Sequence, residues 1–319
     1  MKNLLIILGS ILGAIVLFWV IVNIIPCKKV IEENPFIAKD KTMISAHRGG
    51  AILNPENTQK AFDYVIKETT YTDIVEIDVR TTKDGKLVVI HDETINRTGI
   101  KGEVAPLKIN DLEYEQLKSF NLGVNFVDIN GNKIYENYKP EQASAEGLVI
   151  ITLEQFLIRY NEVRDFKLYL EIKEEGNIGI KAADKALELL NKYSWYKDRT
   201  MMISFSTTVV DHIIEVDKNQ LVGALGYKIA PELVFGLLNL DSLYSANYHG
   251  FQTQTKNSLG PIKVNCATKR FVNMAHKRNQ SITYWTINDQ ETMEKLVNIG
   301  VDVITTNAPD VLAQVLGKI

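Results

Sequence analysis

The chain has 319 residues, of which 45% are hydrophobic and 24% are charged, and its formal net charge is −3. This is the composition of an ordinary globular protein, with enough length for one large domain or two small ones. Because binding to a phosphate backbone needs a clear basic excess, the near-neutral balance argues against nucleic acid as the main partner. The two cysteines, Cys27 and Cys266, lie far apart and form neither a disulfide framework nor a zinc motif.

The first element along the chain is an almost wholly apolar run from Leu4 to Ile25. As a helix it would span about 33 Å, enough to cross the hydrocarbon core of a bilayer. A cleaved signal peptide is the alternative, but no small-x-small cleavage site follows the run. We therefore predict a retained single-pass anchor in residues 1–29 and a linker over residues 30–42. Lysines flank both ends of the run and do not fix its orientation; we expect the following domain to face out of the cytoplasm.

From Lys41 onward, short β-rich runs alternate with helical periods. Eight strands alternating with helices fit a (β/α)₈ TIM barrel, which we expect to occupy residues 43–319. The predicted strands are Met43–Ala46, Ile74–Arg80, Leu168–Lys173, Met201–Phe205, Leu221–Leu225, Leu243–Tyr248, Ile282–Thr286 and Val301–Thr305. The predicted helices between them are Asn57–Lys67, Ile178–Lys192, Thr207–Asp217, Ala267–Arg278 and Gln290–Ile299.

One part of the pattern does not fit a plain barrel. Roughly 70 residues separate Arg80 from a helix predicted near Leu153–Arg164, where a connection would ordinarily be short. The sequence Lys83-Asp84-Gly85 indicates a hairpin turn at the start of this region. We expect a small insertion after the second strand, over about residues 82–150, that covers the barrel mouth.

Carboxylates gather on two neighbouring predicted strands. Residues i and i+2 of a strand project to the same face, so Glu76 and Asp78 lie side by side while aliphatic residues take the other face. Glu171 lies at the end of the third strand by the same logic. Neighbouring carboxylates raise each other's pKa unless a cation neutralises them. Ligands that are all oxygen select a hard cation, Mg²⁺ or Ca²⁺, over Zn²⁺.

Histidine and basic side chains come to the same end of the barrel. His47 and Arg48 follow the first strand, and Lys173 ends the third. Catalytic groups of TIM barrels lie at these C-terminal strand ends. His91 ends an extended run in the insertion hairpin, from which it can fold back over the mouth. Together these side chains predict a charged site rather than a core.

The sequence resembles the glycerophosphodiester phosphodiesterase family, whose fold is a barrel with a small insertion after the second strand. The resemblance covers roughly residues 43–317, and it is specific because many separated motifs occur in order and in the right strand context. The matching motifs are His47-Arg48-Gly49, Pro55-Glu56-Asn57-Thr58, Glu76-Ile77-Asp78, Thr82-x-Asp84-Gly85, His91-Asp92 with Arg97-Thr98, Glu171-Ile172-Lys173, Ser204-Phe205, Trp285-Thr286-x-Asn288, Gly300-Val301-Asp302 and Thr305-Thr306-Asn307.

The resemblance implies a role for each matched side chain. One divalent cation would be bound by three carboxylates, those of Glu76, Asp78 and Glu171. The general base and the general acid would be two histidines, His47 and His91. The phosphate would be clamped, and its developing charge stabilised, by Arg48 and Lys173. The apolar or glycerol side of the pocket would be lined by two aromatic residues, Phe205 and Trp285.

Some matched and unmatched positions carry other expectations. Asn307 stands where many family members carry Asp, and a second threonine is missing after Arg97-Thr98. We interpret Glu56-Asn57 as a cap of the first helix. Asp92 either orients His91 or caps a turn. The remaining polar residues of catalytic type match no motif and are expected to be ordinary surface or core residues: His212, His249, His276 and Cys266.

The sequence thus predicts a membrane-anchored, metal-dependent phosphodiesterase that releases an alcohol and glycerol 3-phosphate from a glycerophosphodiester, or lysophosphatidic acid from a lysophospholipid. Attack on phosphorus by a glycerol hydroxyl or by water would be assisted by one histidine, and the other would protonate the leaving alkoxide. A catalytically silent barrel that binds glycerophosphate groups is an alternative, which the intact set of histidines and carboxylates disfavours. A phospholipase that forms a cyclic phosphate is a further alternative, and the Glu-Ile-Lys motif fits it less well.

Overall fold

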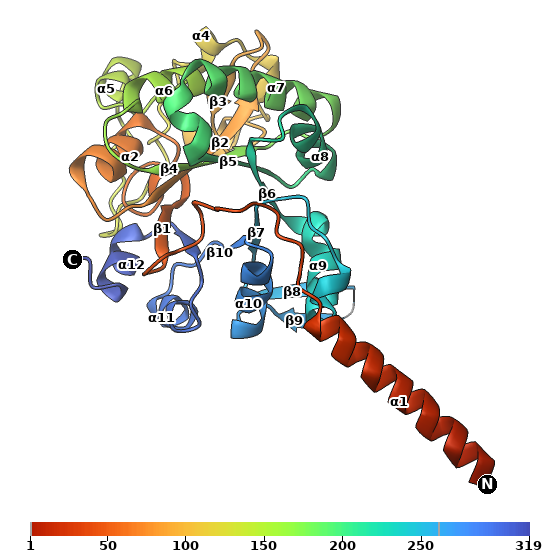
Figure 1. The fold of residues 1–319 in the computed structure, drawn as a ribbon. Coiled ribbons are helices and arrows are strands. Elements are labelled where there is room, and N and C mark those ends of the chain that lie inside the picture. The colour runs from red at the N-terminus through yellow and green to blue at the C-terminus, as the bar shows by residue number, and fades with distance from the viewer. Residues whose placement is uncertain (1, 261) are drawn as a thin grey trace.

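A closed ring of parallel strands surrounded by helices makes up most of the computed structural model, which describes residues 2–260 and 262–319 (Figure 1). The strands follow the order β1-β11-β10-β7-β6-β5-β4-β2, and pairing of β1 with β2 closes the ring. Their bounds are β1 Met43–Ala46, β2 Ile74–Thr81, β4 Lys167–Ile172, β5 Thr200–Ser204, β6 Leu221–Ala224, β7 Gly250–Thr253, β10 Ser281–Tyr284 and β11 Val303–Thr306. The predicted TIM barrel is confirmed.

Helices lie on the outside of the ring and connect its strands. The helices of the barrel are α2 Gln59–Asp63 (continued by a π-helical turn, Tyr64–Glu68), α6 Leu153–Tyr160, α7 Gly176–Lys192, α8 Thr207–Val216, α9 Ala230–Leu237, α10 Lys269–Lys277, α11 Gln290–Asn298 and α12 Pro309–Val315. Their apolar faces pack on the strands, as the 3.6-residue period predicts. Two of them, α9 and α12, have no counterpart among the helices predicted from the sequence.

Most predicted strands lie within two residues of the observed ones, but the sixth is wrong. The expected strand Leu243–Tyr248 begins at the end of a 3₁₀ turn, Asp241–Leu243, and the true strand is β7. Strand β7 begins with a glycine because a Cβ at Gly250 would lie 2.4 Å from the Ser281 hydroxyl. The position of this strand therefore depends on close packing against β6 and β10, and the β-propensity of its residues does not indicate it.

The insertion after β2 builds a small layer of its own. It begins with β3 (Leu87–Val89), which pairs antiparallel with β2 through the predicted hairpin turn. Three short helices follow: α3 Asn96–Gly99, α4 Tyr114–Leu117 and α5 Pro140–Ala145. Buried side chains such as Val88, Ile95 and Leu117 form its core. The backbone N–H of Ile90 donates to the Asp78 carbonyl at 2.9 Å, which fixes the residue that precedes His91 against the barrel.

The expected linker, residues 30–42, packs along the N-terminal ends of the barrel strands. Phe36 is fully buried and stacks on Tyr169 inside the barrel, with ring centroids 5.2 Å apart. The Asn34 amide donates to the carbonyls of His249 at 2.6 Å and Asn279 at 2.9 Å. These contacts make residues 30–42 a plug for one end of the barrel.

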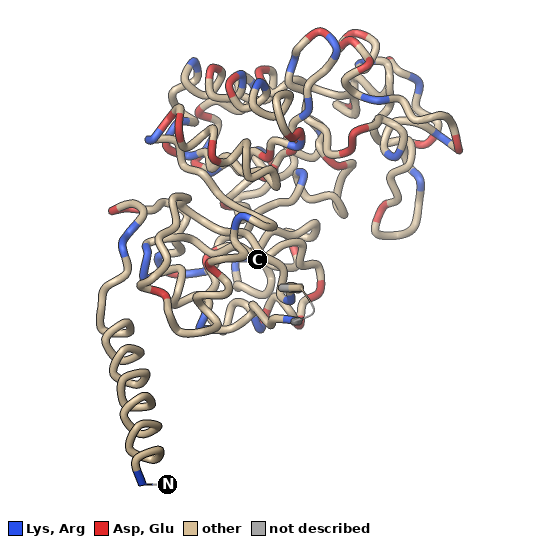
Figure 2. The backbone as a smooth tube through the Cα atoms, turned by 90° about the vertical axis from the view of Figure 1, so that its right-hand side faces the viewer, with Lys and Arg blue, Asp and Glu red and all other residues tan. Residues whose placement is uncertain are grey.

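The apolar run at the N-terminus forms helix α1, Lys2–Ile24, which projects away from the barrel (Figure 1). By length and composition it is able to cross a membrane. A signal sequence meets the same criteria. Figure 2 shows that the helix carries almost no charge along its length, in contrast to the barrel.

Candidate active site

The site begins where β1 ends, in a tight left-handed turn. Arg48, Gly49 and Gly50 have φ values of 53°, 81° and 87°. A Cβ at Gly49 would lie 2.9 Å from that of Ala61, so only glycine fits there. The turn points the Arg48 backbone N–H at Glu76, whose Oε2 accepts it at 2.7 Å. The His-Arg-Gly-Gly sequence thus ties the first strand to the carboxylates of the second.

The three predicted carboxylates do come together at the barrel mouth. Glu76, Asp78 and Glu171 are buried, and one oxygen of each lies within 4.8 Å of the others. The parallel register that pairs Asp78 with Glu171 across β2 and β4 produces this cluster. The Asp78 Oδ1 atom is buried and has no hydrogen-bond partner among the described residues. A buried carboxylate oxygen left unsatisfied, inside an all-oxygen cluster, fits a hard divalent cation.

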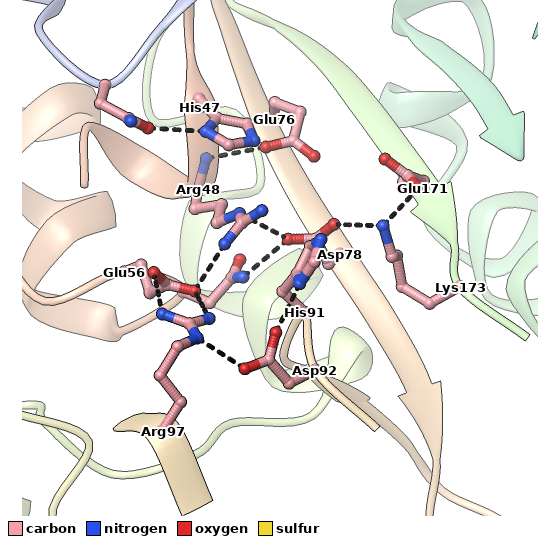
Figure 3. Close-up of polar contacts among 12 residues, drawn as sticks. His47, Arg48, Glu56, Glu76, Asp78, His91, Asp92, Arg97, Glu171 and Lys173 are labelled. Atoms are coloured by element: carbon pink, nitrogen blue, oxygen red, sulfur yellow. Dashed lines mark hydrogen bonds and ion pairs between the residues drawn. The ribbon is translucent and has the colours of Figure 1, made fainter. Parts of the chain in front are cut away.

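Two basic side chains flank the cluster (Figure 3). The Arg48 Nε lies 3.4 Å from Asp78 Oδ2, and Lys173 Nζ lies 2.6 Å from Glu171 Oε1 and 3.6 Å from Asp78 Oδ1. The Asn57 amide donates to Asp78 Oδ2 at 2.9 Å. Asp78 is therefore the centre to which three neighbouring elements converge.

The three carboxylates of the cluster differ in the direction in which their pKa is shifted. Burial, together with repulsion from Asp78, raises the pKa of Glu76 well above its usual range. Burial also raises the pKa of Glu171, although Lys173 opposes the shift. Burial alone would raise the pKa of Asp78, but the positive charges of Lys173 and Arg48 lower it below its usual value. Such opposed shifts within one cavity are typical of functional sites.

His47 is oriented by a residue from the far end of the chain. Its Nδ1 lies 2.6 Å from Oδ1 of Asn307, which follows β11. The Asn307 backbone is in turn held by Asn288, whose Oδ1 accepts its N–H at 2.9 Å. Burial and the nearby Arg48 charge lower the pKa of His47 to about 4. His47 is thus neutral near pH 7, with Nδ1 as the donor to the amide oxygen and Nε2 as a proton acceptor.

His91 is oriented by a chain of charged side chains (Figure 3). Its Nδ1 lies 2.7 Å from Oδ1 of Asp92, and Asp92 Oδ2 accepts from Arg97 Nε at 2.6 Å. Arg97 also forms a two-pronged contact with Glu56, at 2.8 and 2.7 Å, and Glu56 binds Arg48 at 2.9 Å. The open question about Asp92 is answered, since it contacts the His91 ring directly.

Aromatic side chains form the opposite wall of the cavity. Phe205 and Trp285 meet edge to face, with centroids 5.6 Å apart, and Lys173 Nζ lies 5.6 Å from the Phe205 ring. The cavity has a volume of about 80 Å³. All the predicted site residues line it except Asp78, which lies beneath its floor: His47, Arg48, Glu76, His91, Glu171, Lys173, Phe205 and Trp285.

The interpretation of Glu56-Asn57 as a helix cap is wrong. The cap of α2 is Thr58, whose Oγ1 accepts from the Ala61 N–H at 3.2 Å. Asn57 instead has a left-handed backbone, with φ of 54°, which turns its amide toward Asp78. Because α2 begins at Gln59, Thr58 occupies the capping position. Glu56 and Asn57 precede the helix and contact Arg48 and Asp78 of the site instead.

Two residues outside the predicted set belong to the site, and two unmatched histidines lie outside it. Asn307 and Arg97 contact the two histidine systems, and only their membership of matched motifs pointed to them. His212 pairs with Asp184 at 2.7 Å on the surface, and His249 accepts from the Val222 N–H at 3.0 Å. These two histidines lie outside the cavity, as predicted.

The fold and the cavity together define a TIM barrel with a buried acidic centre at its mouth, flanked by two histidines and two basic side chains. Residues 47–311 match the glycerophosphoryl diester phosphodiesterase family. The chain belongs to this family and is an enzyme of its class.

Relatives of known name agree with this assignment, and solved structures agree with the fold. The chain is 28% identical over 270 residues to a glycerophosphodiester phosphodiesterase of Bacillus altitudinis, covering 84% of this chain and 96% of the relative. It is 29% identical over 278 residues to one of Caldanaerobacter subterraneus subsp. tengcongensis, with 87% and 99% covered. Among solved structures, a phosphodiesterase of Oleispira antarctica in complex with the product sn-glycerol-3-phosphate superimposes with a TM-score of 0.65 at 19% identity, covering 87% and 97%. A glycerophosphodiester phosphodiesterase of Agrobacterium tumefaciens gives 0.62 at 20%, covering 86% and 99%.

Proposed function

We propose that the protein is a membrane-anchored, metal-dependent enzyme that hydrolyses glycerophosphodiesters to an alcohol and glycerol 3-phosphate. The observation that carries the proposal is the buried cluster of Glu76, Asp78 and Glu171 with a neutral His47 and an Asp-paired His91 beside it. The glycerol 3-phosphate bound to the Oleispira antarctica relative supports the product class.

The residues divide the work as follows. Glu76, Asp78 and Glu171 would hold one divalent cation, Mg²⁺ or Ca²⁺, which when bound supplies Lewis-acid polarisation of a phosphoryl oxygen. Arg48 and Lys173 neutralise the charge that develops on the other phosphoryl oxygens.

The two histidines manage the protons. His47 Nε2 accepts the proton of the attacking hydroxyl, from water or from the glycerol moiety. His91 holds its Nδ1 toward Asp92 and donates from Nε2 to the leaving alkoxide oxygen, which otherwise leaves poorly near neutral pH. Phe205 and Trp285 pack against the glycerol or apolar part of the substrate.

The helix α1 extends the substrate range that we propose. An enzyme held at a bilayer meets lysophospholipids as well as small soluble diesters, and from a lysophospholipid it would release lysophosphatidic acid. The orientation that we propose places the catalytic domain outside the cytoplasm.

The test is product identification with the full chain in detergent. The protein is incubated with glycerophosphocholine, glycerophosphoethanolamine and lysophosphatidylcholine, with Mg²⁺ or Ca²⁺, and the products are identified by mass. We expect glycerol 3-phosphate or lysophosphatidic acid together with the free alcohol. A cyclic phosphate as the end product would instead identify the phospholipase chemistry, and binding without turnover would identify a silent module.

A further inference from the structure

Helix α9 differs from the other barrel helices in the side that it turns outward. Between Ala230 and Leu240 the chain has a single charged residue, Glu232. Glu232 is buried and pairs with Arg278 at 3.0 Å, so it contributes nothing to the outer side. The outer side of α9 and the 3₁₀ turn that follows it carry aliphatic side chains that are 41% to 57% exposed. This set, which we call the α9 surface, comprises Val234, Leu237, Leu238 and Leu243.

Other helices of the barrel follow the usual pattern. The outer side of α7 carries the exposed pair Lys185–Glu188, and that of α11 carries Glu291–Lys295. Charged residues on the outer side are what a helix in water requires. A group of adjacent exposed aliphatic residues marks a surface that is covered in the working protein.

The α9 surface is continuous with the end of helix α1. Val22, in the last turn of α1, is buried, and its carbonyl accepts from the Ser242 hydroxyl at 2.5 Å. The Asn23 amide donates to the Asn239 carbonyl at 3.1 Å. Both contacts fall between Leu238 and Leu243 in the sequence, so α1 leaves the barrel from within the α9 surface.

Groups suited to a bilayer interface lie on both sides of this exit point along the chain. Trp19 lies in the last turns of α1, and Lys28 and Lys29 follow shortly after its end at Ile24. Tryptophan at the interface and lysine at the level of anionic headgroups are the expected features of such a boundary. The insertion lies at the opposite end of the molecule in Figure 1.

We propose that the α9 surface lies on the lipid bilayer that α1 crosses, so that the barrel rests on the membrane along α9. The proposal rests on the retained anchor of the proposed function. The surface also extends toward the mouth. The 3₁₀ turn Gly226–Ile229 precedes α9 and exposes Tyr227 by 91%. Leu225, which precedes this turn, lines the cavity. A diester whose acyl chain stays in the bilayer therefore reaches the site along an apolar path.

Depth-dependent quenching tests the contact itself. The full chain, with its N-terminus verified by mass, is placed in nanodiscs of phosphatidylcholine and phosphatidylglycerol, in a Cys27→Ser background because Cys266 is buried. A fluorophore is attached to Leu238→Cys or to the control Ile158→Cys, since both native side chains are 57% exposed and Ile158 lies on α6.

Lipids brominated near the headgroup should quench the label at position 238 strongly and leave that at position 158 unchanged. Equal, weak quenching at both positions would overturn the proposal. Shielding of the label at position 238 from water without quenching by lipid would also overturn it, because a second copy of the chain would then cover the surface.

Kinetics provide an independent readout of the apolar path. Leu238→Glu should lower hydrolysis of lysophosphatidylcholine in the nanodisc by roughly fivefold or more, because burying a leucine in lipid is favourable and burying a carboxylate is not. Soluble glycerophosphocholine should be hydrolysed at the parental rate, and Ile158→Glu should change neither rate. Equal rates on the lipid substrate for Leu238→Glu and parent would overturn the path. Quenching needs no turnover, so it decides the contact even if lysophosphatidylcholine proves not to be a substrate.

Discussion

At the residue scale, the site is centred on the buried carboxylate of Asp78 and the side chains that contact it. Asp78 accepts from Asn57, pairs with Arg48 and Lys173, and still keeps one oxygen without a hydrogen bond among the described residues. Removing Arg48 or Lys173 would leave a buried charge less compensated, which costs several kcal/mol. The positive charges of Arg48 and Lys173 therefore stabilise the buried carboxylates of the cluster.

Glu171→Gln tests the metal assignment. The change keeps the shape of the side chain but removes one negative oxygen, so we expect at least about a 100-fold loss of activity with the fold intact. Added Mg²⁺ or Ca²⁺ should raise the Tm of the parent and not that of the variant, because only the native state of the parent binds the ion. Glu188→Gln, on the exposed side of α7, should behave as the parent. Full activity of the parent in excess chelator would exclude a metal role.

His91→Ala tests the identity of the general acid. A general acid matters when the leaving alkoxide is basic, so we expect hydrolysis of natural alcohol esters to fall by roughly 10²–10⁴-fold. Much of the rate should remain on a substrate with an activated phenolic leaving group, whereas His47→Ala should lose activity on both. His212→Ala, outside the cavity, serves as the control. Equal losses on both substrates for His91→Ala would show that this residue is not the acid.

Asn307→Asp tests how His47 is kept neutral. The folded-state pKa of His47, about 4, leaves the ring neutral above that pH, so the base is active through the mildly acidic range. A carboxylate at position 307 would favour the imidazolium and raise the pKa of His47, by roughly one to three units. The acid limb of the kcat/KM profile should then move to higher pH, while Asn273→Asp on the surface of α10 should leave it in place. An unchanged acid limb would mean that a group other than His47 controls it.

At the element scale, residues 30–42 join the apolar helix rigidly to the barrel. The plug formed by Phe36, the hydrogen bonds of Asn34, and the bond from the Ala38 N–H to Asp302 Oδ1 at 2.9 Å leave little freedom between α1 and the strands. A rigid connection fixes which side of the barrel faces a membrane, whereas a flexible one would leave every side free to approach it.

Phe36→Ala tests the plug. The side chain is fully buried against Tyr169, and its loss leaves a cavity that costs about 3–5 kcal/mol of unfolding free energy. We expect the Tm of the detergent-solubilised protein to fall by roughly 5–10 °C. Ile129→Ala, at an exposed position of the insertion, should change it little. A parental Tm for Phe36→Ala would show that the barrel end does not need the plug.

At the scale of the whole molecule, the apolar helix α1 and the insertion over the mouth lie at different ends of the barrel. Helix α1 leaves from the α9 side of the barrel, and the insertion lies at the other end of the molecule (Figure 1). With α1 retained in the bilayer, as we propose, this arrangement would concentrate the enzyme at lipid without burying the site in it.

Membrane extraction tests the anchor. A helix retained in the bilayer resists high salt and alkaline carbonate, because its apolar side chains and not surface charges hold it there. We expect the full-length protein in the pellet after both washes, with Leu4–Ile25 still in its mature N-terminus. Release into the soluble fraction with a new N-terminus near Cys27 would identify a cleaved signal peptide. Protease digestion of intact cells reports the side of the membrane on which the barrel lies.

The barrel, the insertion and the Glu76–Asp78 pair could be predicted from the sequence, whereas the approach of Glu171 to Asp78 depends on the pairing of β2 with β4. The first three follow from local rules: period 2 places Glu76 beside Asp78, and the alternation of strands and helices closes a ring. The tertiary structure alone decided the position of the sixth barrel strand, since Gly250 is selected by the space next to Ser281. It also decided that Asn57 serves Asp78 rather than a helix end, and that Asn307 orients His47 across 260 residues of sequence. Contacts between distant segments depend on how the ring closes, and no local pattern of hydrophobic or turn residues encodes them.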